Sequence, residues 1–131
     1  MSHMIPSGPY KIRNVLYVDR YVHMSGNKEF VGHDVAQIIQ VDVKDVVQHL
    51  ATLYDTETNL YLGIDQIDGK VKGFTDPQVL QLSTEDGVKF EIHPKDVDDV
   101  WYLKDGGNWT FITVQAAPAS EAKYWTFGKA K

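Results

Sequence analysis

The sequence predicts an all-β domain made of three copies of one four-strand unit of about 40 residues. The first observation is an apolar or aromatic residue that opens each copy: Tyr10, Leu50 and Phe90. Eleven residues later comes a second frame position: Tyr21, Tyr61 and Trp101. Ten or eleven residues further comes a third: Val31, Val71 and Ile112. A fixed period of this kind indicates a fold made by repetition and favours a binding scaffold over an enzyme with one catalytic centre.

Each copy also closes on an alternating triplet, which is Gln37-x-Ile39-x-Val41, Gln78-x-Leu80-x-Leu82 or Lys123-x-Trp125-x-Phe127. Alternation of apolar and polar residues is typical of half-buried strands. Such strands are expected at 10–15, 21–24, 37–43, 79–82, 88–92, 109–114 and 124–127. Turn residues separate them at 25–27, 68–69, 86–87 and 105–108, where Asp-Gly and Gly-Asn pairs supply positive φ.

One segment, 35–50, is a candidate for a helix, but its alternation and its valines suit a strand better. A short helical turn over 44–48 stays open. Three copies around a pseudo-threefold axis can close a barrel, with Ile39, Leu80 and Trp125 pointing into a shared core. The alternative is an unrelated all-β sandwich that matches the period by chance. We expect one domain over 5–131, with repeats at 8–48, 49–88 and 89–131, and a vector remnant at 1–4.

Composition excludes several classes of function. Hydrophobic residues make up 43% of the 131-residue chain, which is enough for a core, and the net charge is −5 without a basic stripe. Nucleic acid and anionic membranes are therefore not expected partners. The absence of cysteine removes disulfides, thiolate catalysis and cysteine-ligated metals. No apolar run approaches membrane-span length and no signal peptide is visible, so membrane insertion is not expected and a cytoplasmic location is.

Three stretches of the first repeat carry a specific pattern: SGPYKIRNV at 7–15, YVHMSG at 21–26 and VG at 31–32. They resemble the first repeat of the ricin-B-like β-trefoil proteins of mushrooms, which often open on Gly-x-Tyr-x-Ile-x-Asn and close each repeat on Gln-x-Trp. Here only the third closing triplet keeps the tryptophan, Trp125, and there the glutamine is Lys123. The resemblance spans residues 5–131 and implies a β-trefoil fold. It also implies one of two roles, a sugar-binding lectin or a protease inhibitor, and a homodimer is common among such lectins.

A sugar site combines a carboxylate or amide, an aromatic ring and glycines that let the backbone approach. In the first repeat the resemblance places this site at His23, Ser25, Gly26, Asn27, His33, Asp34 and Gln37. The aspartate usual in the family is His23 here, the second glycine is Asn27, and the asparagine before Gln37 is Ala36. The second repeat offers Asp65 and Phe74, and the third offers Asp105, Gly106, Asn108 and Trp109. The alternatives are ordinary turns for the first and third sets, a position that covers the end of the barrel for Phe74, and the core for Trp109. Glycans or glycoproteins are the expected partners.

The inhibitor interpretation needs only a rigid exposed loop that enters a protease cleft. The loop between Met24 and Phe30 contains Asn27 and Lys28, and Lys28 would suit a trypsin-like pocket. Asn59, in a later loop, would suit an asparagine-specific protease. A solvated turn is the ordinary alternative for all three residues.

No catalytic residue, metal ligand or cofactor is expected. The histidines are scattered, without His-Glu-x-x-His spacing, and no Gly-x-Ser-x-Gly elbow or phosphate-binding glycine loop occurs. His23 and His33 would face each other if the second and third strands pair, with Asp34 adjacent. A chance pair is the better explanation for them.

Overall fold

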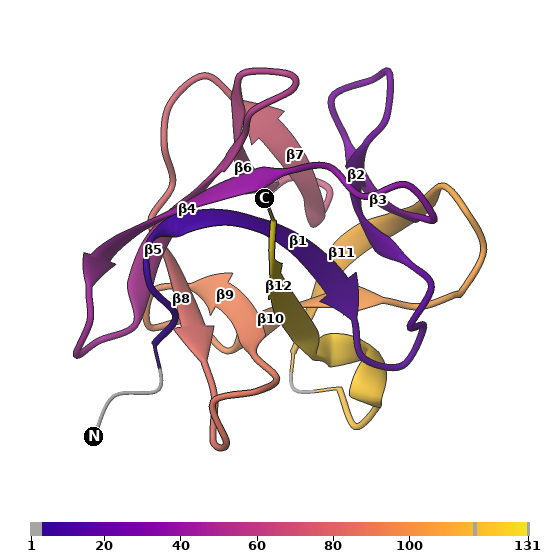
Figure 1. The fold of residues 1–131 in the computed structure, drawn as a ribbon. Helices are drawn as coiled ribbons and strands as arrows, with labels where there is room; N and C mark the ends of the chain where they lie inside the picture. Colours follow the sequence, from indigo (N-terminus) through magenta and orange to yellow (C-terminus); the bar gives the residue numbers. More distant parts are fainter. Residues whose placement is uncertain (1–3, 117, 131) are drawn as a thin grey trace.

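The computed structural model describes residues 4–116 and 118–130 (Figure 1). Of the expected vector remnant, residues 1–3 lie outside the described residues. The first repeat contains β1 (Gly8–Asn14), β2 (Tyr21–Met24), β3 (Phe30–His33) and β4 (Ile39–Asp45). The second contains β5 (Leu50–Asp55), β6 (Leu60–Asp65), β7 (Lys70–Phe74) and β8 (Leu80–Ser83). The third contains β9 (Glu91–Pro94), β10 (Asp99–Leu103), β11 (Thr110–Ala116), the 3-10 helix η1 (Glu121–Lys123) and β12 (Trp125–Lys129).

The first and last strands of the three repeats form a six-stranded barrel in the order β12-β1-β4-β5-β8-β9. The barrel closes between β9 and β12, where Phe90 and Trp125 exchange two backbone hydrogen bonds of 2.9 Å each. The middle strands form the hairpins β2–β3, β6–β7 and β10–β11. β11 pairs with β3 and β7, and a bridge from Glu29 to Lys72 joins the other two hairpins. The β-trefoil prediction is thereby confirmed, and the sandwich alternative is wrong.

The core forms where the repeat predicts it. The three central residues of the closing triplets, Ile39, Leu80 and Trp125, are all 0% exposed. Among the residues that line the same core are the opening residues Tyr10 and Phe90. Because each repeat supplies one apolar side chain at each level, no single repeat can bury its own apolar face.

Two expected elements differ from the structure. The strand expected at 88–92 begins only at Glu91, because the Asp86 carboxylate accepts hydrogen bonds from the N–H groups of Val88 (2.9 Å) and Lys89 (3.1 Å) and holds them in a turn. Residues 44–48 form no helix, since β4 continues to Asp45 and a turn follows at 46–49. Within the described ranges, no helix is long and apolar enough to cross a membrane.

Buried polar side chains fix the loops that follow β1 and β5. Asn14, fully buried at the end of β1, accepts hydrogen bonds from the N–H groups of Leu16 and Tyr17. Asp55, fully buried at the end of β5, accepts from the Glu57 N–H at 3.0 Å and the Thr58 hydroxyl at 2.8 Å. Buried polar groups are tolerated only when bonded in this way, so each side chain dictates the path of the loop beside it.

Candidate functional site

The hairpins of the first and third repeats meet along β3 and β11. Thr110 and Phe111 pair with Gly32 and Val31, and the Trp109 N–H donates to the Gly32 carbonyl at 2.9 Å. The loop before β11 therefore lies against the end of β3. Residues that the sequence assigned to two separate sites, one in each repeat, are brought together here.

Three rings form the centre of this region, and we call His23, His33 and Trp109 the aromatic–imidazole cluster. The two imidazoles stack with centroids 4.4 Å apart and an interplanar angle of 21°, which confirms the expectation that they face each other. The indole of Trp109 meets His33 edge to face at 4.4 Å and His23 at 5.6 Å. Trp109 is 55% exposed, so it is a surface ring and not a core residue.

The Val35 backbone orients both imidazoles. The Nδ1–H of His23 donates to the Val35 carbonyl at 2.9 Å, because a carbonyl oxygen only accepts. The Val35 N–H donates to Nδ1 of His33, also at 2.9 Å, which requires that nitrogen to be unprotonated. The carboxylate of Asp34 lies 3.1 Å from the same His33 nitrogen. The Val35 backbone therefore sets the orientation of both rings.

Polar groups surround the cluster. The side-chain oxygen of Asn108 accepts from the Asp34 N–H at 3.1 Å, which ties the loop of the third repeat to the first. The Asp34 carboxylate is 58% exposed and free to meet a ligand. Asp105 is exposed, and its Oδ1 accepts from the Gly107 N–H at 3.1 Å within the turn. Gly106 lies so close to Tyr17 that an added Cβ would be 2.7 Å from the ring, so the glycine is needed for this loop to approach the first repeat.

Trp109 has an uncommon backbone conformation, with φ at 73°. For a bulky residue this left-handed conformation is a genuine outlier and costs energy. In the first two repeats a left-handed residue also stands just before the third strand. It is Lys28, two residues before β3, with φ at 62°, and Gly69, directly before β7, with φ at 71°. The chain thus places its largest side chain, with its ring exposed, where it uses glycine in the second repeat.

The remaining first-repeat residues lie elsewhere. Ser25, Gly26 and Asn27 form the β2–β3 turn, where the Ser25 hydroxyl accepts from the Asn27 N–H at 3.3 Å. Gln37 is 5% exposed, and its amide bonds the Met24 N–H and, at 2.8 Å, the Asp55 carboxylate. Gln37 therefore stabilises the fold through these hydrogen bonds, and its amide faces the interior and not the solvent.

The structure separates the two second-repeat candidates. Asp65 pairs with Lys70 at the turn end of the β6–β7 hairpin and Phe74 pairs with Tyr61 at the other end, so they lie about 13 Å apart along the strands. The Asp65 carboxylate bonds the Lys72 ammonium at 3.0 Å, and Asp68 bonds it at 2.6 Å. The Ile67 N–H and then Lys72 lower the pKa of Asp65 below its usual value. Asp65 is thus an ion-pair residue of the hairpin.

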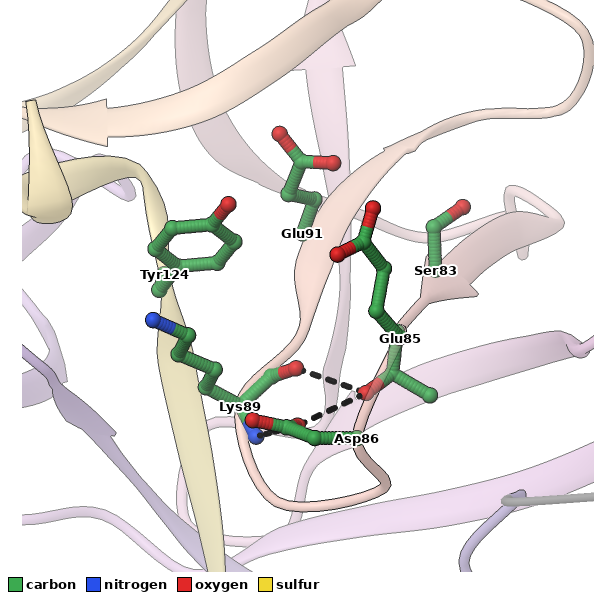
Figure 2. Close-up of a pocket in the computed structure, with 7 residues that line it drawn as sticks. Ser83, Glu85, Asp86, Lys89, Glu91 and Tyr124 are labelled. Carbon is green, nitrogen blue, oxygen red and sulfur yellow. Dashed lines mark hydrogen bonds between the residues drawn. The ribbon is translucent and has the colours of Figure 1, made fainter. Parts of the chain in front are cut away.

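A hollow of about 490 Å³ lies between the β8–β9 turn and the start of β12 (Figure 2). Figure 2 shows the carboxylates of Glu85 and Glu91 and the ring of Tyr124 around it. Lys89 lies over that ring at 4.4 Å and forms an ion pair with Glu121 at 3.0 Å. No local sequence pattern points to these residues, because they come from strands of two repeats. Across residues 4–116 and 118–130, no three His, Asp or Glu side chains are grouped to hold a metal ion.

Comparison with known proteins supports the fold. No protein-family model matches the chain, and a search of curated proteins gave no match. Among solved structures, the ricin B-like lectin of Macrolepiota procera, in complex with lactose, is 21% identical with a TM-score of 0.83, over 97% of this chain and 99% of that one. The Rhizoctonia solani agglutinin is 20% identical with a TM-score of 0.81, over 96% and 97%. A proteinase inhibitor from Coprinopsis cinerea is 12% identical with a TM-score of 0.76, over 96% and 99%.

These similarities confirm the resemblance to fungal ricin-B-like β-trefoil proteins at the level of the fold. The neighbours include both lectins and an inhibitor, so the fold is compatible with either role. Choosing between the roles depends on the surface of this chain.

Proposed function

We propose that this protein is a non-catalytic glycan-binding protein and that the aromatic–imidazole cluster is its binding site. The observation that carries the proposal is the exposed indole of Trp109, held beside two imidazoles, the Asp34 carboxylate and the Asn108 amide. The electron-rich face of an aromatic ring attracts the C–H face of a pyranose. Carboxylate, amide and imidazole groups can then bond the hydroxyls at the edge of the sugar.

Two structural neighbours bear names that agree with this role, one a lectin solved with lactose and the other an agglutinin. A shallow exposed site also suits glycans, which are bound at surfaces through few contacts. The strained backbone at Trp109 adds support, because strain of this kind gathers at functional sites.

Replacing Trp109 with glycine is expected to abolish binding on a glycan array while the protein stays folded. Glycine adopts the φ of 73° without strain, and Gly69 already occupies the corresponding place in the second repeat, so the change removes the ring and leaves the backbone path. The midpoint of thermal unfolding should stay level or rise.

The matched control is Ile67→Gly, which removes a 96% exposed apolar side chain from the β6–β7 turn. It should leave the array pattern unchanged. Full glycan binding by the Trp109→Gly protein would place the site away from the cluster and overturn this assignment.

A second candidate function, protease inhibition, is favoured by the rigidity of the loop 56–59. The buried Asp55 carboxylate bonds Glu57 and Thr58, the Asn59 N–H donates to the Asp55 carbonyl at 2.8 Å, and the Tyr54 hydroxyl bonds the Asn59 side chain at 3.0 Å. An exposed loop that is already ordered loses little entropy on entering a protease cleft. The Met24–Phe30 loop is anchored too, since its Lys28 carbonyl accepts from the Gly73 N–H at 2.8 Å.

If the protein inhibits proteases, Asn59→Gly should abolish inhibition of an asparagine-specific protease. Changing Asn27 and Lys28 together to glycine should abolish inhibition of a trypsin-like one. Asn59 and Lys28 both have φ near 60°, so glycine keeps the loop path and removes only the side chain that a protease would read. The two variants serve as controls for each other in a protease panel. Inhibition that survives both changes would exclude both loops.

A further inference from the structure

The outer wall of the barrel carries a hollow at each junction between repeats. At every junction the last strand of one repeat pairs with the first strand of the next: β4 with β5, β8 with β9 and β12 with β1. Hollows of about 300, 310 and 250 Å³ lie on these pairs. One cross-strand pair occupies the equivalent position at each junction. These pairs are Tyr54 with Gln40, His93 with Gln81, and Arg13 with Thr126. The three hollows are therefore one structural position with three different sets of side chains.

The hollow on β4 and β5, which we call the tyrosine groove, is lined by two aromatic rings. Tyr54 and Tyr61 are partly buried and meet edge to face, with centroids 4.8 Å apart and an interplanar angle of 61°. The Tyr54 hydroxyl donates to the Asn59 side chain at 3.0 Å, which fixes this ring. Two rings at such an angle present apolar faces in two planes, a shape that suits a ring-shaped ligand with C–H faces.

Polar groups of the groove complement these rings. Thr52, a residue of β5 that is only 4% exposed, lines the groove, as does the amide-bearing Gln40 of β4. In the described part of the chain, neither side chain forms a hydrogen bond within the protein, so both can bond a ligand. Asp42 is 56% exposed and paired with Lys44 at 2.7 Å, which gives the groove an acceptor and a donor without net charge.

The other two junctions lack this combination. The β12–β1 hollow is lined by Lys11, Arg13 and Lys129. These side chains form no ion pair within the described residues, so the hollow is positively charged. In the β8–β9 hollow, the Ser83 hydroxyl and His93 Nε2 already bond each other at 2.6 Å, and Glu91 faces Lys123 at 3.6 Å. Only the tyrosine groove, among these three hollows, joins two aromatic rings with uncommitted polar side chains.

We infer that the tyrosine groove is a second carbohydrate site, separate from the aromatic–imidazole cluster, and that it binds a neutral pyranose. The pyranose stacks on Tyr61 and Tyr54, and its hydroxyls bond Gln40, Thr52 and Asp42. The inference rests on the proposed glycan-binding function, because it gives the same domain a second site for the same class of ligand. Charge neutrality selects an uncharged sugar over a sulfated or carboxylated one.

The test is a titration of the ¹⁵N-labelled protein with methyl glycosides of neutral hexoses, each followed by amide chemical shifts. Saturable shifts are expected at Thr52, Tyr54 and Tyr61. Tyr61→Leu should weaken this binding about tenfold, the size of effect expected when one of two stacking rings is removed. Its matched control is Tyr21→Leu, because Tyr21 pairs with Arg13 at the β12–β1 junction as Tyr61 pairs with Tyr54. Tyr21→Leu should leave affinity at the groove unchanged.

Gln40→Ala is a second variant, at an outward-facing position where folding is not at risk, and it should also weaken binding at the groove. Shifts confined to Trp109, His33 and their neighbours would overturn the groove and leave the proposed function standing. Shifts confined to the groove would support it and move the function away from the cluster. No shifts with any hexose would overturn the groove, and so would equal affinity of wild type, Tyr61→Leu and Gln40→Ala. The glycan array with the Trp109→Gly protein tests the proposed function separately.

Discussion

Trp125→Ala is expected to lower the free energy of unfolding by about 4 kcal/mol, within the usual range for deleting a buried tryptophan. Trp125 is fully buried, and its indole N–H donates to the Trp101 carbonyl at 3.2 Å. Its backbone also forms the two hydrogen bonds with Phe90 that close the barrel between β9 and β12. The substitution leaves a cavity at the seam where β9 and β12 are joined only by the Phe90–Trp125 bridge.

Urea denaturation followed by circular dichroism measures this loss. Trp109→Ala is the control for tryptophan content, because Trp109 is more than half exposed and its loss should change stability by about 0.5 kcal/mol or less. A loss at Trp125 no larger than the loss at Trp109 would contradict the role of Trp125 at the seam.

Asp55→Ala is expected to cost about 3 kcal/mol, because it leaves several buried donors without an acceptor. The carboxylate accepts from the Gln37 amide, the Thr58 hydroxyl and the Glu57 N–H at 2.8–3.0 Å. Gln37 also bonds the Met24 N–H, so the same carboxylate stabilises the first hairpin from the second repeat. Amide hydrogen exchange should accelerate both in the loop 56–59 and at Met24.

The control for Asp55 is Asp76→Ala, at an exposed position in the β7–β8 loop, where a change of about 0.5 kcal/mol or less is expected. The outcome that contradicts the network is faster exchange at 56–59 with unchanged exchange at Met24. That result would make Asp55 a local turn residue only.

The period of the sequence was enough to predict the fold, because the residues that recur at this period are the apolar ones that form the core. Ile39, Leu80 and Trp125 could be assigned to the interior from spacing alone, and all three are buried there. Spacing fails where a side chain overrides the pattern. The apolar residues from Val88 onward suggest a strand, yet the Asp86 carboxylate holds Val88 and Lys89 in a turn.

The candidate site could be predicted only in part. His23, His33, Asp34, Asn108 and Trp109 were all named from local patterns, but as members of two separate sites. Their meeting depends on the pairing of β11 with β3, a contact between residues more than 70 positions apart. Local windows carry no information on such a pairing. The same reason hides the tyrosine groove, since Gln40 and Tyr54 become neighbours only through strand register.

The aromatic–imidazole cluster is built from two repeats, and this has a thermodynamic consequence. His23 and His33 belong to one hairpin and Trp109 to the loop of another, so the cluster exists only while both hairpins are docked. A ligand held by all three rings binds the native state and not a partly opened one. By linkage, such a ligand at a hundred times its dissociation constant adds about 2.7 kcal/mol to the stability of the whole domain. Ligand binding at this shallow surface site would then raise the measured free energy of unfolding of the whole domain, including strands that the ligand does not touch.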